Sequence, residues 1–182
     1  FASKKSKAIP VPQRSTCAAR DPWYDLTGLV KPGFAFWPKG QQYRHIVMGN
    51  PDDCPCGCRL YYLNATCTYN EPAFVAVLNS TLVGFWRNFY GRYTGTEGAL
   101  ETMVIDAVMT EVPDPRNIEP PISKKLRSAF QTLGRRPIGD YVEEQLMDCH
   151  APERARRIAC GPLELSQELR QNDRRALDDA VF

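Results

Sequence analysis

The cysteines of one short segment form the most obvious candidate for chemistry. Cys54, Cys56 and Cys58 make a C-x-C-x-C pattern, with His45 nine residues before it and Cys67 nine residues after it. Thiolate and imidazole groups are ligands that zinc prefers, but zinc knuckles usually separate their cysteines by two to four residues. Three sulfurs this close rarely share one tetrahedral ion. A zinc-stabilised interaction module therefore stays as the alternative to a reduced, cysteine-rich hairpin tip, which the spacing favours.

Covalent catalysis finds little support in the sequence. Cys149 and His150 are adjacent, and neighbouring side chains on a helix point about 100° apart, so a nucleophile and its base are not evident. The glycines of segment 93–99 lack the lysine of a phosphate-binding loop and the G-x-G-x-x-G spacing of a dinucleotide site. We therefore assign no catalytic residue to this chain.

Two segments combine cations with aromatic and amide side chains, the residue types that contact phosphates and base edges in DNA. The segment WPKGQQYRH at 37–45 supplies Lys39, Gln41, Gln42, Tyr43, Arg44 and His45. The segment RNFYGRYTGT at 87–96 supplies Arg87, Arg92, Tyr93 and Thr94. A solvated hairpin tip and a helix end with long side chains reaching water would have the same composition. Composition alone leaves both interpretations open.

Charge is distributed unevenly along the chain, although the net charge is only +2. Residues 1–20 carry five lysines and arginines and no acid, and residues 124–136 carry another five cations and no acid. Between them, residues 97–119 hold six acids and one arginine. Such a distribution can create a basic face on a nearly neutral protein. Solvated helix faces would produce the same pattern.

Length and composition indicate one domain with appendages, since the chain has 182 residues of which 43% are hydrophobic. No apolar run approaches the roughly 18 residues of a membrane-spanning helix, and we expect no membrane partner. The first residues lack the apolar core of a secretory signal, so we expect a reducing, cytoplasmic location for the seven cysteines. The chain lacks an initiator methionine and ends inside an apolar-periodic run, and we expect it to be a piece of a longer protein.

The first half of the chain predicts strands. Residues 1–20 are rich in lysine, serine and proline and predict a linker or arm. Segments 33–38 and 43–50 predict strands joined by the turn KGQQ, and segment 59–66 predicts a third strand. An antiparallel meander is the simplest arrangement of the three.

A long helix is predicted to follow, beginning at Asn70 and ending near Gly91, because apolar residues recur there at helical spacing. Asn79 and Ser80 lie inside it, where they either satisfy nearby backbone groups or reach DNA. Segment 99–105 predicts a strand, followed by a short helix capped by Asp106.

Helices dominate the rest of the chain. Residues 123–133, 138–149 and the tail from Pro162 are predicted to be helical. The predicted fold class is therefore α+β, with a small antiparallel β-sheet, a long packed helix and a helical C-terminal part.

The order of several short motifs resembles a known family, the target-recognition region that follows the catalytic domain in adenine-specific N6 DNA methyltransferases of restriction–modification and phage-defence systems. The similarity covers about residues 20–182. It is carried by DPWYDL at 21–26, RH at 44–45, RLYYL at 59–63, FVAVLNSTLVGFW at 74–86, GR at 91–92, GTEGALE at 95–101 and VPDP at 112–115.

The resemblance implies that the chain reads double-stranded DNA and does not itself transfer methyl groups. The catalytic half of such enzymes carries an (Asn/Asp)-Pro-Pro-aromatic motif and an S-adenosylmethionine loop, and neither occurs here. An N-terminal catalytic methyltransferase domain is the implied partner, with S-adenosylmethionine as its cofactor. The implied organisation is an arm at 1–20, a target-recognition-like domain at 21–117 and a helical segment at 118–182, truncated at its end.

The same resemblance suggests roles for the selected residues. Lys39, Arg44, Arg87 and Arg92 would hold phosphates, whereas Gln41, Gln42 and His45 would read bases. Tyr90 or Tyr93 would stack on a base or support the loop, and Tyr43 and Thr94 belong to the same predicted DNA-binding surface.

Overall fold

The computed structural model describes residues 9–28, 30–42, 44–93, 99–139 and 167–181, with side chains from 172 onward in the last range. Contacts divide the chain into two compact units, Phe1–Lys31 and Pro32–Phe182. Two short helical elements form in the first unit, where only an arm was predicted: η1 (Val11–Gln13) and α1 (Ser15–Ala18). The second unit contains residues on both sides of the boundary predicted after residue 117.

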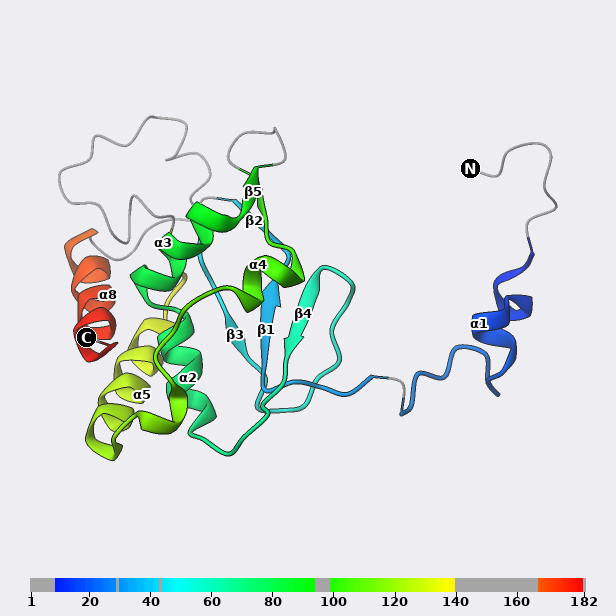
Figure 1. Cartoon of the computed structure of the whole chain (residues 1–182), viewed down its shortest axis with the longest axis horizontal. Coiled ribbons are helices and arrows are strands. Elements are labelled where there is room, and N and C mark those ends of the chain that lie inside the picture. Colours follow the sequence, from blue (N-terminus) through cyan, green and yellow to red (C-terminus); the bar gives the residue numbers. More distant parts are fainter. Residues whose placement is uncertain (1–8, 29, 43, 94–98, 140–166, 182) are drawn as a thin grey trace. The chain divides into compact units, whose positions relative to one another are not determined.

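The second unit has an α+β fold with two three-stranded antiparallel sheets (Figure 1). In the first sheet the order is β3 (Met48–Gly49), β1 (Ala35–Pro38), β4 (Leu60–Leu63), so β1 is central and the predicted meander is wrong. In the second sheet the order is β2 (Gly40–Gln42), β6 (Ala99–Glu101), β5 (Arg92–Tyr93). Gly40–Gln42, predicted as a turn, therefore forms a strand of the second sheet.

Lys39 is the point at which the chain passes from one sheet to the other. Its backbone N–H donates to the carbonyl of Arg59 beside β4 at 2.9 Å, and its carbonyl accepts from Thr102 N after β6 at 2.7 Å. Because these two partners flank strands of different sheets, the chain passes from the first sheet to the second at Lys39. The segment predicted as a hairpin turn is thus a link between sheets.

The predicted long helix is interrupted at Asn79 and Ser80. It consists of α2 (Glu71–Leu78), which is capped by the Asn70 side chain, and α3 (Thr81–Tyr90), which is capped by Ser80. The Asn79 amide donates to the carbonyls of Val47 and Val75, both at 2.8 Å, and accepts from Val47 N at 2.9 Å. Both residues satisfy backbone groups, as one of the two predictions stated. Since Asn79 is 4% exposed and Ser80 0%, the prediction that they reach DNA is wrong.

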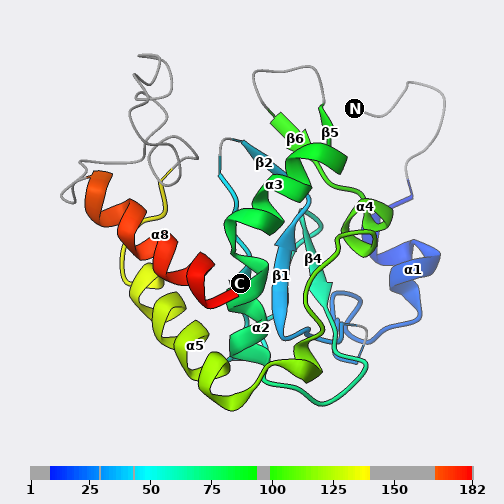
Figure 2. The same cartoon turned by 60° about the vertical axis from the view of Figure 1, so that its left-hand side comes forward.

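Two hydrophobic clusters share α2. One joins β1 to α2 and α3 around Ala35, Trp37, Val47 and Val83. The other joins α2 to α5 (Pro120–Gly134) and α8 (Gln167–Val181) around Ala76, Leu126, Leu133 and Leu177. Figure 2 shows the resulting layers, with α2 between the first sheet and the α5–α8 pair.

The remaining helices agree with the sequence in type and differ at their ends. The strand and short helix predicted after residue 99 are β6 and α4 (Val104–Val108), and the Asp106 carboxylate accepts from Met103 N at 2.9 Å. Helix α5 begins at Pro120, before the predicted Ser123, because proline suits the first turn. A 3-10 turn, η2 (Pro115–Asn117), precedes it. The helix predicted at 138–149 lies almost wholly outside the described residues.

Polar contacts lock α8 onto the junction between α2 and α3. The Asp178 carboxylate accepts from both the N–H and the hydroxyl of Thr81, which satisfies a donor at the start of α3. Arg174, 4% exposed, donates to the carbonyl of Asn79. The interruption of the predicted helix is therefore a docking point for the C-terminal helix.

Replacing Asn79 with alanine should lower the free energy of unfolding by about 2–4 kcal/mol, because the buried N–H and C=O groups of Val47 lose their partners. Urea unfolding followed by circular dichroism measures this. Asn64→Ala, at an exposed position, is the control and should change stability by less than about 0.5 kcal/mol. Equal effects of the two substitutions would contradict a structural role for Asn79.

Candidate functional site

The second sheet brings together the two segments selected from the sequence. Gln41 lies opposite Leu100, and Leu100 lies opposite Tyr93 on its other side. Gly40 and Arg92 lie on either side of Glu101. Strands β2 and β5 are both antiparallel to β6. They therefore run parallel to each other, and their carboxyl ends lie at the same end of the sheet. Residues separated by about fifty positions therefore share one small sheet.

The two faces of this sheet differ. Side chains alternate along a strand, so Gln41, Leu100 and Tyr93 share one face, and the buried Leu100 marks it as the inner one. Gln42, Glu101 and Arg92 occupy the opposite face. We call this the outer face of the second sheet. Arg92 and Tyr93, predicted to act together, consequently point in opposite directions.

Arg87 lies beneath the inner face and is 1% exposed. Its guanidinium donates to Thr102 Oγ1 and to Gln41 Oε1, both at 2.8 Å, and to the carbonyl of Pro38. The guanidinium carbon also lies 4.9 Å from the centre of the Trp37 ring. The prediction that Arg87 holds a phosphate is wrong because its donors are already used inside the protein. Gln41 is also held from within, which contradicts its predicted role as a base reader.

Glycine is required at the end of α3, where the chain turns into β5. A Cβ atom on Gly91 would lie 2.6 Å from the Arg87 carbonyl oxygen and 2.7 Å from the Leu100 side chain. The predicted helix end at Gly91 is confirmed. This close approach sets β5 against β6 directly above Arg87.

His45 is also buried, at 4% exposure, so the prediction that it reads a base is wrong. Its Nε2 atom lies 2.7 Å from the carbonyl oxygen of Leu78, which identifies Nε2–H as the donor. Its ring packs against Gly84, where an added Cβ would come within 3.3 Å. Burial and, next, the Arg87 charge lower the pKa of His45 to about 3, so the imidazole is neutral at pH 7.

The outer face holds two exposed members of the predicted site, Gln42 and Arg92. Gln42 is exposed, and the Arg92 side chain is 61% exposed while its Nε lies 3.4 Å from an Asp106 oxygen. Arg59, which the sequence analysis did not select, lies 3.9 Å from Glu101. Exposed ion pairs contribute only about 0–1 kcal/mol, so a phosphate could compete for either arginine. The position of Arg59 immediately before the predicted strand rich in Leu and Tyr was the signal that could have identified it.

Of the other predicted residues, Lys39 is half-buried with its ammonium 4.8 Å from the centre of the Tyr61 ring. Arg44 is half-buried too. Tyr43 and Thr94 lie outside the described residues. The second sheet thus brings Gln42, Arg92 and Tyr93 to one end of the fold, with Lys39 at the start of β2.

The cysteine segment does not form a metal site in the part of the chain that the structure describes. No three His, Cys, Asp or Glu side chains gather there in a group that could hold a metal ion. His45 points into the core, and Cys54, Cys58 and Cys67 are exposed thiols. The structure therefore gives no support to the zinc-stabilised alternative.

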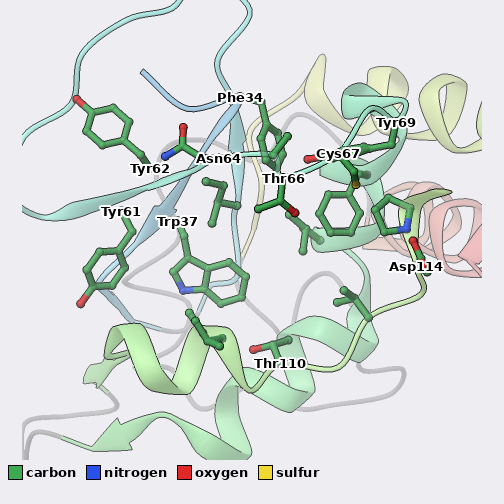
Figure 3. Close-up of a pocket in the computed structure, with 18 of the residues that line it drawn as sticks. Phe34, Trp37, Tyr61, Tyr62, Asn64, Thr66, Cys67, Tyr69, Thr110 and Asp114 are labelled. Atoms are coloured by element: carbon green, nitrogen blue, oxygen red, sulfur yellow. The ribbon is translucent and has the colours of Figure 1, made fainter. Parts of the chain in front are cut away.

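An aromatic groove of about 840 Å³ lies between the segment that follows β4 and the segment that contains α4 (Figure 3). Trp37 forms its centre, and its buried Nε1–H has no acceptor among the described residues. The sequence analysis missed this groove, although the spaced aromatic residues of 34–37, 61–62 and 69–74 were a visible signal. Its lining, which includes Phe34, Trp37, Tyr61, Tyr69 and Phe74, is of the kind that suits an apolar or aromatic group.

Proton transfer at neutral pH does not suit the groove. Hydrogen bonds from Arg116 lower the pKa of Asp114 to about 2. Burial, followed by the charges of Glu71 and Cys67, raises the pKa of Tyr69 to about 12. A general acid or base works best with a pKa near the operating pH. Neither of these two groups therefore has a pKa suited to acid–base catalysis at neutral pH.

No helix in the described ranges combines the length and the apolar character needed to cross a membrane.

Arg87→Lys should lower the free energy of unfolding by about 1–3 kcal/mol, because an ammonium cannot reproduce the planar fork of donors. Arg92→Lys is the matched control and should change stability by less than about 0.5 kcal/mol, since its side chain is 61% exposed. Chemical denaturation at pH 7 gives both values. An unchanged free energy of unfolding in Arg87→Lys would contradict the anchoring role of Arg87.

Stability should fall between pH 7 and pH 5 because of His45. Its pKa is about 3 in the folded protein and about 6.5 in the unfolded chain, so the unfolded chain binds more protons in this range. The loss approaches about 2 kcal/mol at pH 5. His45→Gln should flatten this dependence in denaturation curves, whereas His150→Gln, at the other histidine of the chain, should preserve it. If the free energy of unfolding of His45→Gln still falls between pH 7 and pH 5, groups other than His45 cause the effect.

Comparison of the chain with protein-family models, with curated proteins and with solved structures finds no match.

Proposed function

We propose that this chain is the target-recognition region of a site-specific adenine-N6 DNA methyltransferase and binds double-stranded DNA through the outer face of the second sheet. The observation that carries the proposal is the pairing of both β2 and β5 with β6. This pairing brings together the two segments that combine cations, amides and aromatic side chains. The order of motifs described above supplies the family.

Roles on the outer face follow from side-chain chemistry. Arg92 and Arg59 would contact phosphates, exchanging their carboxylate partners for the DNA backbone. Gln42 would read a base edge, since an amide can bond an adenine at two atoms. Glu101 lies between them and could accept from a cytosine amino group. Tyr93 is 66% exposed but points away from the outer face, so it would support the adjoining loop and would not stack on a base beside Gln42.

Methyl transfer would belong to an N-terminal catalytic domain that uses S-adenosylmethionine, and this chain would act in the cytoplasm as its DNA-reading partner. By holding the duplex, the chain would help to offset the few kcal/mol required to extrude the target adenine. Arg87 supports this role indirectly, because it fixes the second sheet against the core.

Duplex DNA binding should weaken steeply as salt rises from 50 to 200 mM, because phosphate contacts release counterions. Arg92→Gln should reduce the slope of log affinity against log salt by about 1. Arg116→Gln is the matched control, since Arg116 is also exposed and paired with an aspartate, and it should leave the slope unchanged. Fluorescence anisotropy with a labelled 30-base-pair duplex measures both. Absence of salt-dependent binding by the unaltered chain would overturn the proposal.

A further inference from the structure

Helix α5 has two faces of different character. One face packs into the second hydrophobic cluster through Leu126, Phe130 and Leu133. The opposite face is exposed and carries Lys124, Arg127 and Gln131, with Arg135 just beyond the last turn. These four residues follow helical spacing and define what we call the α5 basic face.

The cations of this face have no ion-pair partner among the residues that the structure describes. The described ion pairs use Arg59, Arg92, Arg116 and Arg136. Lys124, Arg127 and Arg135 take part in none of them, and the sequence of α5 contains no acid. Three uncompensated positive charges therefore line one exposed face.

Helix stability does not account for these charges. The helix dipole favours cations in the last turn only, which could explain Arg135. Lys124 and Arg127 lie in the first half of α5, where the dipole gives a cation no advantage. Of the α8 acids with described side chains, Asp178 binds Thr81, Asp173 binds Arg136, and Asp179 lines a pocket beside Lys125, which is not part of the α5 basic face. The charge of the α5 basic face is therefore not compensated by the described residues.

The spacing of the face fits an extended polyanion. From Lys124 to Arg135 the helix rises about 16 Å at 1.5 Å per residue, a length over which one DNA strand presents about five phosphates. Gln131, between the cations, adds an amide donor of the kind that binds phosphate oxygens. A line of this length suits a nucleic-acid backbone better than a single phosphate group.

We propose that the α5 basic face is a second DNA-contact surface, which binds the phosphate backbone independently of sequence. This inference rests on the proposed function and adds a partner site outside the second sheet. The outer face would read bases, while the α5 basic face would hold the duplex or its flanking region by charge alone. Contacts of this type fix position and carry no sequence information.

The test compares two triple variants with the same change in net charge. Lys124→Gln/Arg127→Gln/Arg135→Gln removes the cations of the α5 basic face. Arg14→Gln/Lys31→Gln/Arg116→Gln removes three exposed cations elsewhere. Binding of the full 182-residue chain to a random-sequence 40-base-pair duplex is measured at several salt concentrations. Thermal unfolding of each variant, followed by circular dichroism, shows that it is folded.

The α5 variant should reduce the salt slope by about 2–3 and the control by less than about 1. Equal reductions would overturn the inference, because the effect would then be one of net charge. An unchanged slope in the α5 variant, together with a reduced slope in Arg92→Gln, would overturn only this inference. Failure of the unaltered chain to bind would overturn the proposed function as well. If the α5 variant loses binding to phosphatidylserine vesicles while its salt slope for DNA binding stays unchanged, the face binds a membrane surface. That result would also overturn the inference.

Discussion

The buried guanidinium of Arg87 is the interaction on which the arrangement of both sheets depends. It joins α3 to the end of β1 at Pro38, to β2 at Gln41 and to the residue after β6 at Thr102. Strands of two or three residues cannot form a stable sheet by themselves. Bonds to an ionised donor are stronger than neutral ones, so one arginine can fix several short strands at once. The outer face is therefore a rigid surface, because its inner side is tied to the core.

A second constraint acts at Asn79, where one side chain replaces a strand partner. The side-chain amide of Asn79 exchanges two hydrogen bonds with the backbone of Val47. The backbone carbonyl of Asn79 accepts a hydrogen bond from Arg174. The first sheet, the α2–α3 junction and α8 consequently meet at one residue. A continuous helix would have placed the Asn79 carbonyl inside an intrahelical bond and left α8 without this acceptor. Breaking the helix is the structural condition for attaching the C-terminal part.

Local signals in the sequence predicted most elements and the α+β class, since periodicity and capping depend on neighbouring residues. The β6–α4 step and the end of α3 at Gly91 are examples. The roles of Arg87 and His45 could not be predicted in this way. Gln41 precedes Arg87 by 46 positions and Leu78 follows His45 by 33, and no local pattern records such pairings. A basic, aromatic segment whose arginine is buried can have the same composition as a segment whose arginine contacts phosphate.

The described cations divide according to the chemistry that each site needs. The buried ones are all arginines, namely Arg87, Arg136 and Arg174, because a guanidinium offers five donors that can satisfy several buried acceptors. Lysine offers a compact charge with no fixed fork, and none of the described lysines is buried. A phosphate backbone requires charge more than fixed geometry, so either residue serves there. Mixed Lys and Arg on an exposed face, as on α5, therefore favours an electrostatic role, whereas an arginine surrounded by apolar residues favours a structural one.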